Sequence, residues 1–162
     1  MILKLRQRMA QEESGFTLVE LLVVMLILGL LAAIAIPAFF NQQSKAKDAD
    51  AKAAVRTAQT AMETFRTDHN GSYADANVTA GDPDSLQKIE PTLNDVGTRL
   101  SIPAVSDDSY TVQVESAADS GNLYQISRAA DGTTSLDCGT TAGVPPTGDG
   151  VDGCPSGGDW GG

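Results

Sequence analysis

The sequence predicts an α+β protein, in which a long N-terminal α-helix packs on a small antiparallel β-sheet head. Apolar residues are concentrated before residue 41, and alternating strand patterns separated by Gly-containing turns follow residue 109. The 162 residues, 41% of them hydrophobic, are enough for one modest core. We therefore divide the chain into a basic N-terminal segment (1–15), an apolar helix (16–40), an amphipathic helix (41–70) and a globular head (71–162).

The first fifteen residues, MILKLRQRMAQEESG, contain Lys4, Arg6 and Arg8. By the positive-inside rule these cations favour a cytoplasmic N-terminus, whereas Glu12 and Glu13 contribute little to orientation. A membrane-anchored chain with this N-terminus would therefore expose its head outside the cytoplasm.

A stretch of twenty residues without a charge, Leu21–Phe40, follows this segment. As a helix it would be about 30 Å long, which matches the hydrocarbon core of a membrane. A cleaved secretory signal is the alternative, with Ala33 and Ala35 at the cut, but its apolar region is only about 7–15 residues long. The run also leads directly into residues rich in Ala, Lys, Gln and Glu, which are good helix formers. We therefore expect one continuous helix that spans a membrane and extends beyond it.

Glu20, Gly29 and Pro37 depart from the apolar pattern of this helix. An unpaired carboxylate costs about 2.5–3.5 kcal/mol at the centre of a membrane, so Glu20 requires either a functional explanation or snorkelling to the headgroups. Proline removes one backbone donor and disfavours helix in the residue before it. We therefore expect a kink or a locally extended section near Ile36.

Beyond Pro37 the apolar residues form a narrow stripe that is expected to pack on a sheet. The stripe consists of Ala51, Val55, Ala58, Met62 and Phe65. The charged residues around it are assigned to the polar face, and they are Lys47, Asp48, Lys52, Arg56, Glu63 and Arg66. The sequence Asp68–Gly71 contains Asn-Gly, which suits the positive φ of a helix end.

The head contains strand patterns at Tyr110–Val114, at Leu123–Ser127 and, more weakly, at Thr133–Asp137. Gly-containing turns connect them, which predicts an antiparallel meander. Residues 72–108 contain three prolines and are predicted to be mostly loop, with a short helix around Ser85–Ile89. The Gly-rich tail after residue 155 is expected to be flexible, with Trp160 either a contact residue or exposed.

Cys138 and Cys154 are the only cysteines, and fifteen residues separate them. If the head lies outside the cytoplasm, the pair can be oxidised to a disulfide. Such a bond would close a loop that has no core of its own and contribute about 3 kcal/mol. Zinc binding is the competing interpretation, and it is improbable because His69 is the only histidine.

The net charge of −10 is concentrated in residues 71–162, which carry −11. An acidic head repels phosphate backbones, so we predict no direct nucleic-acid binding. The sequence has no Gly-rich phosphate loop, and His69 belongs to no recognisable catalytic constellation. Asp149 and Asp152 do not reproduce the spacing of a Ca²⁺ loop. No catalytic residue, metal or cofactor is therefore expected, and the chain is not predicted to be an enzyme.

The stretch GFTLVELLVV, from Gly15 to Val24, resembles the processing and assembly motif of type IV pilins and of the pseudopilins of type II secretion. The resemblance implies that prepilin peptidase removes residues 1–15 by cutting after Gly15 and methylates the new amine of Phe16. It assigns Glu20 to a salt bridge with the N-terminal amine of an adjacent subunit. It also implies that the stretch from Gly29 to Pro37 can unwind in an assembled pilus. The cysteine pair resembles the disulfide-bounded C-terminal loop of many pilins.

The resemblance implies a structural role, as the major pilin of a type IV pilus that serves adhesion, motility or DNA uptake. The alternative is a pseudopilin of a type II secretion system, which forms a short periplasmic filament that drives protein export. The implied partners are further copies of the chain in a helical filament, prepilin peptidase, the pilus assembly machinery and the inner membrane. Before assembly the chain would be a single-pass protein of the cytoplasmic membrane with its head outside. After assembly it would belong to an extracellular pilus.

Overall fold

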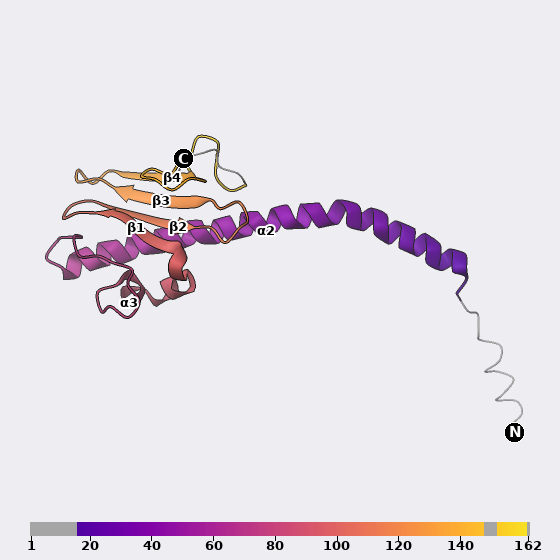
Figure 1. Cartoon of the computed structure of the whole chain (residues 1–162), viewed down its shortest axis with the longest axis horizontal. Coiled ribbons are helices and arrows are strands. Elements are labelled where there is room, and N and C mark those ends of the chain that lie inside the picture. Colours follow the sequence, from indigo (N-terminus) through magenta and orange to yellow (C-terminus); the bar gives the residue numbers. More distant parts are fainter. Residues whose placement is uncertain (1–15, 148–151, 162) are drawn as a thin grey trace, which may run out of the picture. The chain divides into compact units, whose positions relative to one another are not determined.

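The computed structural model describes residues 16–147 and 152–161. The chain forms two compact units, Met1–Phe40 and Asn41–Gly162, and one helix, α2 (Leu18–Asp68), contributes to both (Figure 1). The basic segment 1–15, with Gly15, lies outside the described residues, and so does Asp149.

In the first unit, α2 is apolar on all sides. Every large hydrophobic side chain from Phe16 to Phe40 is exposed in the single chain. Among the described residues, α2 is the one helix that contains an apolar stretch long enough to cross a membrane. This part of the chain therefore has no internal core to cover it, and its apolar surface requires lipid or other protein chains.

The helix continues through Gly29 and Pro37 without a break. Ile36 is helical, so no extended section interrupts α2 in the single chain. Proline removes one backbone hydrogen bond, and a long helix tolerates this loss when the remaining turns hold its geometry. Unwinding between Gly29 and Pro37 concerns the assembled filament and stays a prediction.

In the second unit, the apolar stripe of α2 is buried as predicted. Val55, Ala58, Met62 and Phe65 have no exposed surface. The helix ends at Asp68, where Asn70 and Gly71 adopt φ values of 55° and 89°. The Gly71 N–H donates to the Arg66 carbonyl at 2.9 Å, which satisfies one of the last carbonyl groups of the helix. The predicted stop signal is therefore confirmed.

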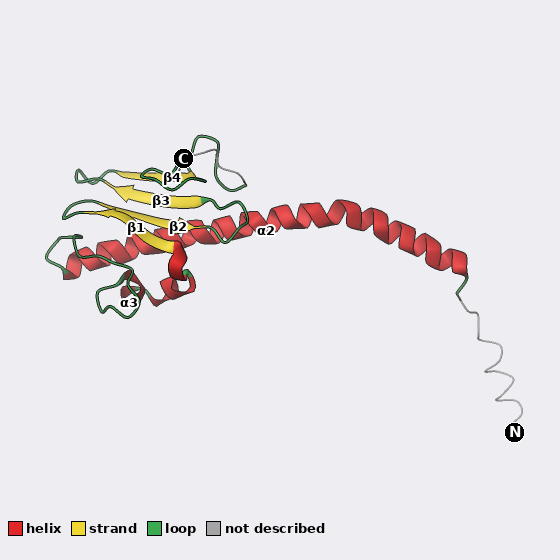
Figure 2. Cartoon of the chain, in the orientation of Figure 1, coloured by secondary structure: helices red, strands yellow, loops and turns green. Residues whose placement is uncertain are grey.

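A four-stranded antiparallel sheet packs across this part of α2 (Figure 2). Its strands lie in the order in which they occur along the chain. They are β1 (Leu100–Val105), β2 (Tyr110–Glu115), β3 (Leu123–Arg128) and β4 (Thr134–Gly139). Gly121 and Gly132 have positive φ in the β2–β3 and β3–β4 turns. The last three strands confirm the predicted meander.

The prediction that residues 72–108 are mostly loop is wrong for β1. Pro103 lies inside this strand, and the pairing with β2 shifts between Ser101 and Ala104. Because β1 is an edge strand, proline costs no hydrogen bond on its open side, and a bulge absorbs the irregularity. Pro103 was therefore a mark of a sheet edge rather than of a loop.

Short helical segments connect α2 to the sheet. The predicted short helix is present as α3 (Leu86–Ile89). Two 3-10 turns that the sequence did not predict, η1 (Pro91–Asp95) and η2 (Gly97–Arg99), follow it. Leu86 and Leu93 are buried and join the core between α2 and the sheet.

All three tyrosines of the chain lie in this core and are at most 2% exposed. The hydroxyls of Tyr73 and Tyr110 donate to the two carboxylate oxygens of Glu63 at 2.8 and 3.0 Å. Burial, reinforced by Glu63, raises the pKa of both tyrosines above the usual value. Burial and the carboxylate of Asp48 raise the pKa of Tyr124 in the same way.

These tyrosines predict a steep loss of stability at high pH. Above about pH 10 an unfolded chain ionises its tyrosines, whereas the folded head keeps them neutral, so unfolding releases protons. With three such groups, the free energy of unfolding should stay level below about pH 9.5 and then fall by up to about 4 kcal/mol per pH unit.

The measurement is an alkaline titration of the chain in detergent micelles, followed by tyrosinate absorbance and by circular dichroism. Both signals should change together, at the pH where the head unfolds. Tyrosinate that forms near pH 10 while the dichroism stays native would show that the tyrosines are accessible in the folded head.

Candidate functional site

The start of α2 is fixed by Thr17. The Glu20 N–H donates to the Thr17 hydroxyl at 3.2 Å and to the Thr17 carbonyl at 3.1 Å, while the Leu21 N–H donates to the same carbonyl. A threonine that precedes a helix satisfies donors that the first turn would leave open. We did not predict this cap, although Thr-x-x-Glu before an apolar run is its sequence signature.

The cap positions Glu20 in the first turn of the helix. Phe16 lies just before the helix, and its side chain is 79% exposed. A carboxylate is favoured near the positive end of the helix dipole, yet it needs a cation when lipid surrounds it. Within the described part of the chain, no cation lies within 4 Å of Glu20 to form an ion pair. The side chain is therefore available to a group from another molecule.

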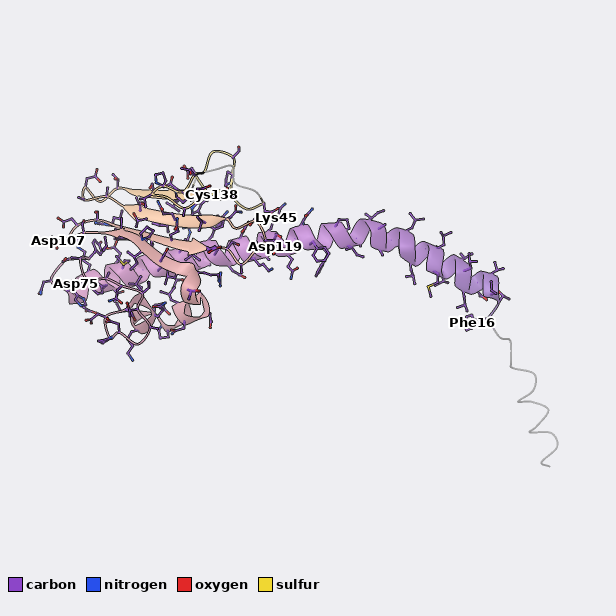
Figure 3. All side chains as sticks on the ribbon, viewed as in Figure 1. Phe16, Lys45, Asp75, Asp107, Asp119 and Cys138 are labelled. Carbon is purple, nitrogen blue, oxygen red and sulfur yellow. A yellow bond between two sulfur atoms is a disulfide. The ribbon has the colours of Figure 1, made fainter. Side chains whose placement is uncertain are left out.

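The C-terminal loop is closed by a disulfide between Cys138 and Cys154, as predicted. Their Cα atoms are 5.9 Å apart, and both residues are buried. Cys138 belongs to β4 (Figure 3), so the bond ties the loop to the edge of the sheet. Because both sulfurs are in the disulfide, neither can serve as a thiolate ligand of zinc.

Two residues one turn apart on α2 hold the backbone of Gly153. The Gly153 N–H donates to Oδ2 of Asp48 at 2.9 Å, and Nζ of Lys52 donates to the Gly153 carbonyl at 2.7 Å. Asn122, in the β2–β3 turn, also donates to Oδ2 of Asp48 at 3.0 Å. Asp48 is only 1% exposed, so its assignment to the polar face is wrong. These hydrogen bonds to the Asp48 carboxylate offset part of the cost of burying it.

The tail after residue 155 is anchored rather than flexible in its described part. Nε1 of Trp160 donates to the Asp137 carbonyl at 2.9 Å, and the Cys138 N–H donates to the Gly158 carbonyl. The Trp160 ring also lies 5.0 Å from the guanidinium of Arg56 and 5.8 Å from Nζ of Lys52. Trp160 is therefore a contact residue, which resolves one of the alternatives that the sequence left open.

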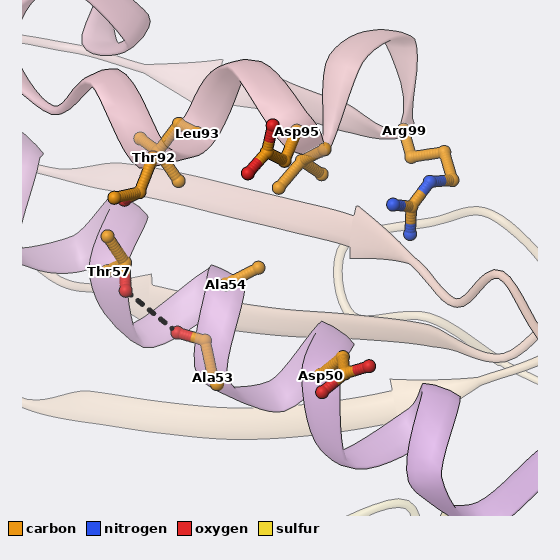
Figure 4. Close-up of a pocket in the computed structure, with 9 residues that line it drawn as sticks. Asp50, Ala53, Ala54, Thr57, Thr92, Leu93, Asp95 and Arg99 are labelled. Atoms are coloured by element: carbon orange, nitrogen blue, oxygen red, sulfur yellow. Dashed lines mark hydrogen bonds between the residues drawn. The ribbon is translucent and has the colours of Figure 1, made fainter.

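A groove of about 530 Å³ lies between α2 and the two 3-10 turns (Figure 4). Ala53, Ala54, Leu93 and Val96 line its apolar part, and the Thr57 hydroxyl donates to the Ala53 carbonyl at 3.1 Å. Across residues 16–147 and 152–161, no group of three His, Cys, Asp or Glu residues is placed to hold a metal ion. Both apolar and polar residues of the head line this groove.

Two family models match adjoining parts of the chain. Residues 11–36 match the prokaryotic N-terminal methylation motif. Residues 37–142 match the model described as the type IV minor pilin ComP, DNA uptake sequence receptor, and this match covers more than half of the chain. The chain belongs to the type IV pilin family. The resemblance found at residues 15–24 is thereby confirmed at the level of the family.

Two similar proteins match most of the chain, and a third matches about a third of it. The type IV major pilin protein PilA of Myxococcus xanthus is 29% identical over 92% of this chain and 71% of that protein. The type IV major fimbrial protein FimA of Dichelobacter nodosus is 28% identical over 84% of this chain and 95% of that protein. The type II secretion system core protein G of Pseudomonas aeruginosa is 36% identical over 36% of this chain and 42% of that protein.

The close approach at Gly153 predicts a stability effect of Gly153→Ala. A Cβ atom there would lie 2.7 Å from Cβ of Asp48 and 2.9 Å from the Tyr124 hydroxyl. Overpacking of this kind costs about 1–3 kcal/mol, so the free energy of unfolding should fall by that amount. Urea unfolding of the chain in detergent, followed by circular dichroism, measures it.

The matched control is Gly157→Ala, four residues further on in the tail, because a Cβ atom at Gly157 would meet nothing within 4 Å. Its unfolding midpoint should equal that of the parent chain. Equal midpoints for both variants would show that the contact of Gly153 with Asp48 does not hold the loop.

Proposed function

We propose that the chain is a structural subunit of a type IV pilus, cut after Gly15, methylated at Phe16 and polymerised through the N-terminal part of α2. The observation that carries this proposal is the apolar surface from Phe16 to Phe40, which is exposed in the described part of the single chain. A membrane covers it before assembly, and the helices of other subunits cover it in a filament. The acidic head keeps the coated filament soluble.

Glu20 sets the register between subunits in this proposal. Cleavage after Gly15 gives Phe16 a free amine, and each charge is costly alone in an apolar environment but stable as a pair. An amine from one chain and the Glu20 carboxylate of the next therefore select one axial stagger. The stretch from Gly29 to Pro37 then unwinds when the helices pack together, because its proline lacks one backbone donor.

The role of major pilin is favoured over that of pseudopilin. Two major pilin or fimbrial proteins match the chain over most of the head, whereas the match to core protein G covers only 36% of the chain. We do not extend DNA recognition to this chain, because residues 71–162 carry −11.

Sheared cell-surface filaments test this proposal. Electron microscopy should show long filaments, and mass spectrometry should identify subunits that begin with N-methylated Phe16. A mature protein that still begins with Met1 would overturn the processing step. Short filaments confined to the periplasm would favour the pseudopilin instead.

The register role predicts that Glu20→Ala prevents polymerisation without preventing membrane insertion. Breaking a buried ion pair costs about 3–5 kcal/mol, so filament yield should fall by at least about 100-fold. Quantitative blotting of the sheared filament fraction and of the membrane fraction measures the two effects separately. Glu115→Ala, at an exposed position at the end of β2, is the control and should give the parent yield. A normal yield from Glu20→Ala would contradict the register role.

A further inference from the structure

We propose that Lys45 and Lys47 bind the headgroups of anionic phospholipids while the chain is in the membrane. The inference rests on the proposed membrane-anchored state before assembly. It concerns the first turns of α2 in the second unit, directly after the apolar run ends at Phe40. It therefore identifies a lipid chemistry that the unassembled subunit prefers.

The spacing along the helix places Lys45 at the outer edge of the headgroup layer and Lys47 about one or two residues of helix beyond it. Lys45 and Lys47 follow Phe40 by five and seven residues, which corresponds to about 7.5 and 10.5 Å of helix. The headgroup region extends about 5–7.5 Å beyond the hydrocarbon core on each side. A lysine stem is long enough to direct its charge back toward this layer. The exposed rings of Phe39 and Phe40 end the apolar run just before this level.

These two lysines differ from the other cations of the second unit's helix. Lys52 donates to the Gly153 carbonyl, Arg56 contacts the Trp160 ring, and Arg66 donates to the Gly71 carbonyl. Within the described part of the chain, neither Lys45 nor Lys47 forms an ion pair or a side-chain hydrogen bond. Figure 3 shows the Lys45 side chain on α2 near the beginning of the head. Their charges are therefore available to an external anion.

The directions of the two side chains favour a lipid layer over a protein partner. Two residues of helix separate them by about 200°, so they leave opposite sides of α2. Lys45 is exposed, and Lys47 is half-buried beside the buried Asp48. A single docked protein would reach one of the two lysines, whereas a headgroup layer extends around all of the helix that the head leaves open.

The positive charge is confined to the segment 41–47, and the nearest carboxylates belong to the following turn of α2 or to the head. Asp48 is buried and holds Gly153, and Asp50 lies about 15 Å of helix beyond Phe40, outside the headgroup layer. Two exposed carboxylates of the head lie on the side of Asp48: Asp119, in the β2–β3 turn near Asn122, and Asp152, next to Gly153. Residues 41–47 themselves contain two lysines and no acidic residue. An anionic surface is thus the chemistry that this part of the helix fits.

Amine acylation of the full chain in lipid nanodiscs tests the proposal, with mass spectrometry reporting the rate at each lysine. The comparison is between discs of phosphatidylcholine alone and discs that also contain phosphatidylglycerol. The negative surface raises the local proton concentration about threefold, so the reactive neutral amine becomes about threefold scarcer. Acylation of Lys45 and Lys47 should therefore be at least about threefold slower in the anionic discs. Salt at about 1 M, where the screening length is about 3 Å, should remove the difference.

Lys88 is the control within the same molecule. Lys88 belongs to α3. His69, just past the end of α2, contacts Asp84, just before α3, so Lys88 lies toward the other end of the buried part of α2. Its rate should be the same in both discs. Equal rates for Lys45 and Lys47 in the two discs would overturn the lipid proposal while leaving the pilus proposal intact. If acylation of Lys45 and Lys47 is slow only in assembled filaments, the two lysines contact a neighbouring chain and the lipid proposal is wrong. Failure of the chain to enter either disc would overturn both proposals.

Discussion

The organisation of this pilin depends on one helix that carries two different surfaces. From Phe16 to Phe40, α2 is apolar on every side, and from Ala51 to Phe65 it has a single buried stripe. A sheet can cover one stripe of a helix but not its whole circumference. The head packs on the second part, and the exposed apolar surface of the first part needs lipid or other protein chains as cover. The proposed polymerisation uses this surface, which is the same in every copy.

The same helix also organises the C-terminal loop. A segment with many Gly and Pro residues cannot build its own core. Three sets of contacts order it: the disulfide to β4, the hydrogen bonds of Asp48 and Lys52 with the Gly153 backbone, and the contacts of Trp160. The Trp160 segment also pairs with β4, which covers an edge that would otherwise expose open backbone groups. The opposite edge, β1, is protected differently, by Pro103 and a bulge.

The elements that were predicted from sequence are those whose signal is local. The stripe on α2, the three later strands and the Asn-Gly stop each follow from periodicity or turn chemistry within a few residues. The disulfide was predicted for a different reason, because Cys138 and Cys154 are the only cysteines of a head expected outside the cytoplasm. Strand β1 was missed because Pro103 is read as a loop signal until its place at a sheet edge is known. Asp48 was assigned to the surface by its charge, although its position three residues before Ala51 continues the buried stripe. Only the distant backbone of Gly153 explains why a carboxylate belongs there.

The cap at Thr17 connects local structure to assembly. A glutamate at this position of a helix can accept a hydrogen bond from the N–H of the N-cap residue. Its carboxylate would then be less available to another chain. Here the Thr17 hydroxyl and carbonyl accept the hydrogen bonds of the first turn, and the Glu20 carboxylate is not needed for the cap. Removal of residues 1–15 would place a new cation at Phe16, within one turn of that carboxylate along the same chain. In the proposed filament, every subunit would present one donor and one acceptor charge at the same depth. Pairing between copies would neutralise both, and each added chain would offer the next pair.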